Sequence, residues 1–204
     1  MELGWFMVSA LALIVAPGPD LMMVIAQGMT HGRRAGAWTA LGLATGCLLH
    51  TTLVTLGAAA LLQTSDMLFN ALKFAGAAYL LWLAWQAFQH RVDFMMPEQV
   101  PGGEAWQLYR RGILMNALNP KVSMFFLAFL PQFVSANSPT MTLDLAKLGL
   151  IFALMTAVIF TLGGIAAAWI GTNLRRNATI RKALGWLTAT VFAAIGLRLL
   201  VLQR

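Results

Sequence analysis

Long apolar stretches separated by short polar connections run through the whole chain. Six of them reach about the 20 apolar residues that cross a bilayer as a helix, at residues 3–28, 37–62, 67–88, 112–134, 146–170 and 183–202. No remaining stretch is long enough to fold as a separate soluble domain. The pattern predicts an all-α integral membrane protein with six transmembrane helices.

Composition supports this interpretation. Of 204 residues, 59% are hydrophobic and only 10% are charged, whereas soluble domains carry about 25% charged residues. No Lys or Arg precedes Arg33, so the first segment lacks the basic start of a cleavable signal peptide and is expected to remain as a span. The single cysteine, Cys47, cannot form an internal disulfide.

The basic residues predict the orientation in the membrane. Most of them fall in the loops after the first, third and fifth spans: Arg33, Arg34, Arg91, Arg110, Arg111, Arg175, Arg176, Arg181 and Lys182. Short loops rich in Lys and Arg stay in the cytoplasm, so both termini should lie outside. This asymmetry also accounts for the net charge of +7 without a nucleic-acid partner.

The longest connection divides the chain into two halves. Residues 91–110 include Pro101-Gly102-Gly103, a composition that disfavours regular structure, and we expect a polar cytoplasmic linker here. Residues 1–90 then form a first three-helix repeat and residues 111–204 a second one, within a single transmembrane domain. An odd number of spans in each half makes the two repeats inverted relative to each other.

Short matches between the halves support a repeat. Leu41-Gly42-Leu43 recurs as Leu148-Gly149-Leu150, and Pro19-Asp20 is matched by Pro120-Lys121. Proline removes a backbone donor and clashes with the preceding turn, so helices 1 and 4 are predicted to be interrupted at these motifs. Interrupted helices at corresponding positions of two halves indicate the binding site of a transporter.

Asp20 and Lys121 occupy equivalent positions and carry opposite charges. An ionisable side chain at membrane depth suggests a function. A carboxylate is stabilised at a helix N-terminus, whereas a lysine there is disfavoured unless an anion binds. We therefore expect Lys121 to receive a substrate carboxylate and Asp20 an ammonium group, as in a zwitterionic amino acid. The alternative is a structural Asp20–Lys121 ion pair that holds the two broken helices together.

The predicted substrate-binding set comprises the residues around both breaks: Pro17, Gly18, Pro19, Asp20, Asn116, Asn119, Pro120 and Lys121. The amides of Asn116 and Asn119 can either cap freed backbone groups or contact substrate. Asp20 and His50 are the candidates for proton coupling, although an intramembrane histidine also serves as an interhelical hydrogen-bond partner. Burial favours a protonated carboxylic acid and a nearby lysine favours the ionised form, so the sequence leaves the state of Asp20 open.

Other chemistry has little support. The three histidines fall on different elements, and no carboxylate or cysteine completes a metal site. There is no glycine-rich nucleotide motif and no catalytic constellation with readable geometry. We expect a transporter rather than an enzyme, without a cofactor or a resident metal.

Several blocks resemble a known family. Ala16-Pro17-Gly18-Pro19-Asp20, the segment 112–121 and the segment 126–133 resemble the lysine exporter superfamily, specifically its RhtB (homoserine/threonine exporter) branch. The resemblance implies secondary active export of amino acids from the cytoplasm across the bacterial inner membrane, by an antiporter that exchanges protons. This family often carries Asn where the present chain has Asp20.

Three alternatives remain beside amino-acid export: an ion or metal exporter of the same superfamily, an integral-membrane enzyme acting on lipid head groups, and a structural membrane subunit. One carboxylate matched by one lysine leaves little net negative charge at the site. We therefore expect a small neutral amino acid as substrate rather than a basic one. A homodimer is compatible with six spans joined by short loops.

Overall fold

The computed structural model describes residues 3–58, 66–89, 100–135, 138–176 and 178–201. Within these ranges every regular element is helical, which confirms the predicted all-α class. The α-helices are α1 (Leu3–Val15), α2 (Pro19–His31), α3 (Arg33–Leu53), α5 (Asp66–Gln89), α6 (Ala105–Ala117), α7 (Pro120–Met124), α8 (Met141–Arg176) and α9 (Ala178–Val201). Val54–Ala58 (η1) and Phe125–Phe129 (η2) are π-helical, and Leu130–Phe133 (η3) is a 3-10 helix.

Two of the described helices have the length and composition of membrane spans. In the described part of the chain, Arg33–Gly57 and Met141–Trp169 are each long and apolar enough to cross a bilayer. The pair α1 and α2 is bent by 56°, and the pair α6 and Pro120–Phe133 by 50°. Each bent pair has the length and composition of one further span, which gives up to four.

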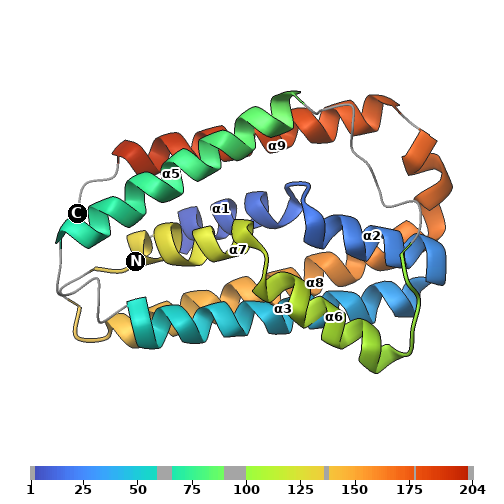
Figure 1. The fold of residues 1–204 in the computed structure, drawn as a ribbon, viewed down its shortest axis with the longest axis horizontal. Helices are drawn as coiled ribbons and strands as arrows, with labels where there is room; N and C mark the ends of the chain where they lie inside the picture. Colours follow the sequence, from blue (N-terminus) through green and yellow to red (C-terminus); the bar gives the residue numbers. More distant parts are fainter. Residues whose placement is uncertain (1–2, 59–65, 90–99, 136–137, 177, 202–204) are drawn as a thin grey trace.

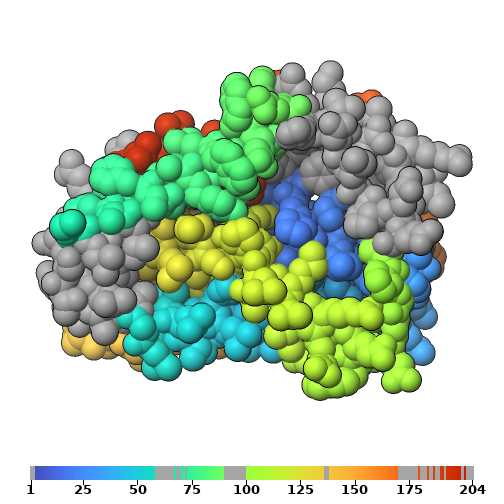
Figure 2. Space-filling model, in the orientation of Figure 1, coloured from blue at the N-terminus to red at the C-terminus, as the bar shows by residue number. Residues whose placement is uncertain are grey.

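The helices form three layers (Figure 1). Helices α5 and α9 pack side by side in one outer layer, while α3 packs against both α6 and α8 in the opposite one. Helices α1, α2 and α7 lie between these layers. Figure 2 shows the same order on one face, with η2 in yellow between α5 in green and α3 in cyan. The two helix breaks therefore lie inside the bundle.

Aromatic rings fix the segment that follows the second break. Phe125 of η2 packs against Phe152 of α8 with ring centroids 4.9 Å apart, and against Phe6 of α1 at 6.3 Å. All three rings are buried. These contacts hold η2 between α1 and α8, and so place the beginning of α7 next to the first break.

Glycines allow close backbone contacts between helices that are far apart in the sequence. A Cβ atom added at Gly28 of α2 would clash with the carbonyl oxygen of Gly164 in α8, and one added at Gly42 of α3 would clash with the carbonyl oxygen of Tyr109 in α6. Small residues let helix backbones approach closely in membrane proteins. Helix α2 therefore packs closely against α8, and α6 packs closely against α3.

The expectation of an irregular linker was wrong for residues 105–110, which belong to α6. The proline and glycine residues end at Gly103, and Glu104 and Gln107 then form a capping box. The backbone N–H of Glu104 donates to Gln107 Oε1 at 3.2 Å, an arrangement that stabilises a helix start. Residues 91–99, including Arg91, lie outside the described residues.

Candidate functional site

The first break joins α1 to α2 through Ala16, Pro17 and Gly18. Ala16 still donates its N–H to Ala12 at 2.9 Å, and Pro17 and Pro19 have no N–H to satisfy. Gly18 adopts an extended backbone with φ −177°, and Pro19 occupies the first turn of α2, where proline is favoured. The break leaves the carbonyl oxygen of Ala16 beyond the end of α1.

Asn119 organises the second break. Its side-chain oxygen accepts a hydrogen bond from the backbone N–H of Lys121 at 3.0 Å, which makes it the N-cap of α7. Pro120 follows it in the first turn of α7. Capping, one of the two roles considered for this residue, is therefore present. Its amide nitrogen is buried and has no hydrogen-bond partner among the residues that the structure describes.

Asn116 connects the two breaks. Its Nδ2 atom donates to Asp20 Oδ2 at 2.6 Å, from the end of α6 to the start of α2. Gly46 of α3 makes room for this side chain, because a Cβ atom there would lie 2.6 Å from Asn116 Cβ. Asp20 and Asn116 are both buried. The two motifs predicted from separate halves are thus joined by a direct hydrogen bond.

Lys121 does not form the direct ion pair with Asp20 that was considered as a structural alternative. Its ammonium group donates to the carbonyl oxygen of Ala16 at 2.7 Å and lies over the ring of Phe192 at 5.4 Å from the centroid. The last carbonyls of a helix lack intrahelical partners, and the negative end of the dipole favours a cation there. The long side chain therefore reaches past Gly18 to the end of α1.

His50 of α3 contacts the backbone of Asn116, which bonds to Asp20. Its Nε2 atom is 3.0 Å from the backbone oxygen of Asn116, and its ring packs on Phe126 with centroids 5.6 Å apart. The interhelical hydrogen bond considered for this histidine is therefore present. A role in proton transfer remains a prediction.

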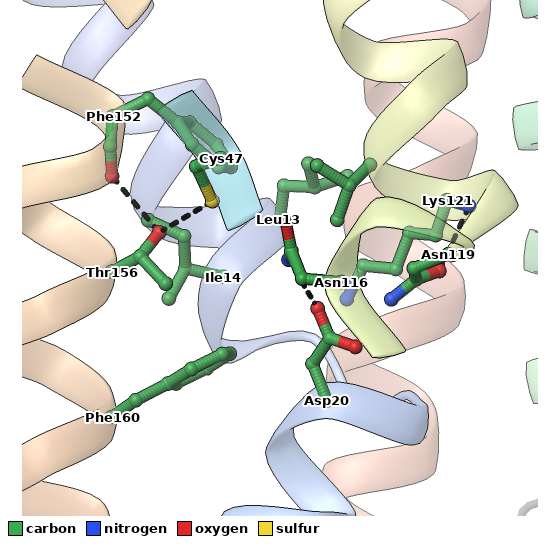
Figure 3. Close-up of a pocket in the computed structure, with 11 residues that line it drawn as sticks. Leu13, Ile14, Asp20, Cys47, Asn116, Asn119, Lys121, Phe152, Thr156 and Phe160 are labelled. Carbon is green, nitrogen blue, oxygen red and sulfur yellow. Dashed lines mark hydrogen bonds between the residues drawn. The ribbon is translucent and has the colours of Figure 1, made fainter. Parts of the chain in front are cut away.

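A small cavity lies between these groups (Figure 3). Its volume is ≈ 20 Å³, room for about one water molecule. The lining combines residues of several helices: Leu13, Ile14, Asp20, Cys47, Asn116, Asn119, Lys121, Val122, Phe152, Thr156 and Phe160. Asp20, Asn116, Asn119 and Lys121 thus share one cavity, while Pro17, Gly18, Pro19, Pro120 and His50 lie outside its lining.

Three buried polar atoms at the cavity have no partner within the described protein. They are Asp20 Oδ1, Asn116 Oδ1 and Asn119 Nδ2. Buried polar groups are nearly always hydrogen-bonded, so such exceptions indicate a site for something else. Two of these atoms are acceptors and one is a donor, and Lys121 adds a cation beside them. The cavity therefore offers acceptors to a cationic group and donors to an anionic group.

Sequence reasoning missed the residues on the other side of the cavity. Phe152, Thr156 and Phe160 belong to α8, and Thr156 Oγ1 is 3.9 Å from Cys47 Sγ. Their spacing of four residues puts them on one helix face, which is a readable signal. Nothing in the sequence indicates that this face lies opposite Asp20. Among the described residues, no three His, Cys, Asp or Glu side chains are grouped to hold a metal ion.

A separate set of hydrogen bonds joins α2 and α6 to the segment that precedes α6. The carbonyl oxygen of Pro101 accepts hydrogen bonds from Gln27 Nε2 of α2 at 3.0 Å and from Arg111 Nη1 of α6 at 2.9 Å. Arg111 also donates to Gly102 at 2.9 Å. We call Gln27, Pro101 and Arg111 the clamp. It ties α2 to α6. Arg33 and Arg34, predicted in a loop, begin α3, and Arg110 and Arg111, also predicted in a loop, lie within α6.

The comparison with protein families gives one match. The family described as LysE type translocator matches residues 11–203 of the chain. No solved structure matches the chain significantly.

Named relatives cover nearly the whole chain. A protein named homoserine/homoserine lactone efflux protein from Salmonella typhi is 30% identical over 94% of the chain and 95% of its own length. A leucine efflux protein from Klebsiella pneumoniae is 26% identical over 97% of the chain and 94% of its own length. The uncharacterized membrane protein YahN of Escherichia coli K12 is 32% identical, over 67% of the chain and 62% of that protein.

Proposed function

The chain belongs to the LysE type translocator family, and on this premise we propose that it is a secondary active exporter of amino acids from the cytoplasm. Membership of a translocator family makes it a membrane transporter rather than an enzyme. The relatives named for the efflux of leucine and of homoserine support amino acids as the substrate class. They do not favour an ion or metal exporter.

The chemistry of the cavity carries this proposal. An amino acid presents an ammonium and a carboxylate group on one carbon. Asp20 Oδ1 and Asn116 Oδ1 are buried acceptors for the ammonium, and Asn119 Nδ2 and Lys121 Nζ are donors for the carboxylate. A substrate carboxylate would compete with the carbonyl oxygen of Ala16 for Lys121. The site is matched in charge to a neutral zwitterion, which supports small neutral amino acids.

We also propose six spans arranged as two inverted repeats. Helices α5 and α9, each 24 residues long, would be about 36 Å long. They would be the third and the last span along the chain, and would bring the total from four to six. Equivalent elements of the two halves pack together, α3 with α8 and α5 with α9. Under this arrangement the arginine-rich ends of α3, α6 and α8 face the cytoplasm of a bacterial cell, and both termini lie on the outer side of the inner membrane.

Transport by alternating access requires the bundle to open. The cavity of ≈ 20 Å³ is too small for an amino acid, so the surrounding helices must move apart to admit one. The clamp and the contact between Gly28 and Gly164 close the proposed cytoplasmic side. We propose that substrate enters when α2 and α6 separate there.

Proton exchange is the coupling that we propose, with Asp20 as the carrier and His50 as a second candidate. Asp20 Oδ1 has no hydrogen-bond partner in the described part of the chain, which leaves it a position for a proton. His50 reaches Asp20 indirectly, since it contacts the backbone of Asn116, whose side chain bonds to Asp20. A carboxylate that is protonated in one half of the cycle and binds ammonium in the other would exchange protons for substrate.

An efflux panel tests the proposal. Cells that overproduce the wild type, Asp20→Asn, Lys121→Ala or Lys147→Ala are loaded with each of the twenty amino acids, and efflux is measured at equal protein abundance. Lys147 is a matched control, since its side chain is exposed and its ion-pair partner among the described residues is Asp144, at 3.4 Å. We expect faster efflux of some neutral amino acids by wild type and control, and at least tenfold less by Lys121→Ala. No enhanced efflux of any amino acid by the wild type would refute the proposed function.

A further inference from the structure

The α8 side of the cavity has a different chemistry from the side that carries the charges. Phe152, Thr156 and Phe160 are each at most 4% exposed and line the cavity opposite Asp20 and Lys121 (Figure 3). Apart from one hydroxyl group, these side chains offer only rings and a methyl group. An amino acid held by its ammonium and carboxylate groups at the helix breaks would direct its side chain toward α8.

We propose that this face of α8 is the subsite for the substrate side chain, and that the Thr156 hydroxyl selects between hydroxylated and aliphatic amino acids. This inference rests on the proposed amino-acid export. It goes beyond it by naming residues that determine specificity at the same cavity.

The hydrogen bonds of Thr156 define what it can offer. Its hydroxyl donates to the carbonyl oxygen of Phe152 at 2.9 Å, so its single proton is used. A hydroxyl oxygen has two acceptor positions, and the only donor directed at it in the described chain is the thiol of Cys47 at 3.9 Å. Because a thiol is a weak donor, Thr156 can accept a hydrogen bond from the hydroxyl of a substrate such as threonine or homoserine.

Phe160 sets the size of the subsite. Its ring lines the cavity at the end nearest the first helix break in Figure 3, while Thr156 lies one turn earlier in α8. Replacing a buried phenylalanine by a smaller residue leaves a cavity that is filled only partly by relaxation. A shorter side chain at this position should therefore admit larger substrates.

Competition for export tests the role of the hydroxyl. Thr156→Val replaces the hydroxyl by a methyl group of similar size, and cells loaded with an equimolar mixture of leucine and threonine report the ratio of the two effluxes. One neutral hydrogen bond corresponds to about a three- to tenfold change, so we expect the leucine-to-threonine ratio to rise by that factor. Thr156→Ser, which keeps the hydroxyl, should retain the threonine preference of the wild type.

Thr52→Val is a matched control, because Thr52 is exposed on α3 and also donates to the carbonyl four residues earlier, at 2.9 Å. Its efflux ratio should equal that of the wild type. If Thr156→Val proves unstable, Phe160→Leu provides the second test, with an expected relative gain for phenylalanine and methionine. Normal total export with unchanged ratios in the stable variants would overturn the subsite, whereas absence of export by the wild type would instead refute the proposed function.

Discussion

The ammonium group of Lys121 donates a hydrogen bond to the carbonyl oxygen of Ala16 at 2.7 Å, across 105 residues of sequence. The reciprocal connection runs from Asn116 to Asp20 at 2.6 Å. Each helix break is thus bonded to the other, and neither Asp20 nor Lys121 takes the opposite charge as its hydrogen-bond partner. A ligand that binds both charges would have to replace at least part of this bonding.

Removing the ammonium of Lys121 should destabilise the protein. Lys121→Met keeps the length of the side chain but leaves the carbonyl oxygen of Ala16 without this donor. Hydrogen bonds to charged groups contribute about 1.5–3 kcal/mol, so we expect a lower midpoint of thermal unfolding in detergent. Lys147→Met should leave the midpoint unchanged, and equal midpoints for the two variants would contradict the assigned contact.

Gly46→Ala should impair transport through Asn116. The added methyl would lie 2.6 Å from Asn116 Cβ, so the asparagine must move away from Asp20. We expect at least a tenfold loss of amino-acid efflux at normal abundance. Gly163→Ala, at a helical glycine with nothing within 4 Å of the added atom, should transport normally. Full activity of Gly46→Ala would show that the bond between Asn116 and Asp20 is dispensable.

The contact between α2 and α8 should not tolerate a side chain at Gly28. A methyl group there clashes with the backbone of Gly164, and overpacking of this kind costs about 1–3 kcal/mol. Gly28→Ala should therefore unfold at a lower temperature than the wild type in detergent. Gly4→Ala on α1, where nothing lies within 4 Å, is the control. A midpoint equal to that of the control would mean that the two helices separate without cost.

Weakening the clamp should expose the cavity. Cys47 is the only cysteine of the chain and is buried in the cavity lining, so its labelling rate reports access. In the double variant Gln27→Ala, Arg111→Ala, we expect a membrane-impermeant maleimide to label Cys47 faster in inverted vesicles, and leucine to slow the labelling. The wild type in the same vesicles is the reference. Unchanged labelling would exclude the clamp as a closing device.

Proton coupling through Asp20 predicts a specific response to pH. Proton entry would drive export, so acidifying the outside should accelerate efflux by the wild type. Asp20→Asn can still accept the hydrogen bond from Asn116 but cannot release a proton. We expect this variant to lose the acceleration by acid while it retains exchange of labelled for unlabelled amino acid. Acceleration equal to that of the wild type would refute Asp20 as the carrier.

Local patterns determined much of this protein. Apolar runs and the low content of charged residues are enough to predict an all-helical membrane protein, because a bilayer leaves few other ways to satisfy the backbone. The unusual neighbours of Asp20 and Lys121 likewise marked both residues as candidates. The capping of α7 by Asn119 also follows from local chemistry, since an asparagine before a proline suits a helix start.

Only the tertiary structure decided the partners of these residues. Lys121 bonds to Ala16 rather than to Asp20, because its partner depends on where α1 ends relative to α7. The neighbours of Gly46 and Thr156 also depend on how distant helices pack. Gly46 makes room for Asn116, and Thr156 reaches the cavity from α8. A helical repeat tells which residues share a face, but the packing of distant helices determines what that face meets.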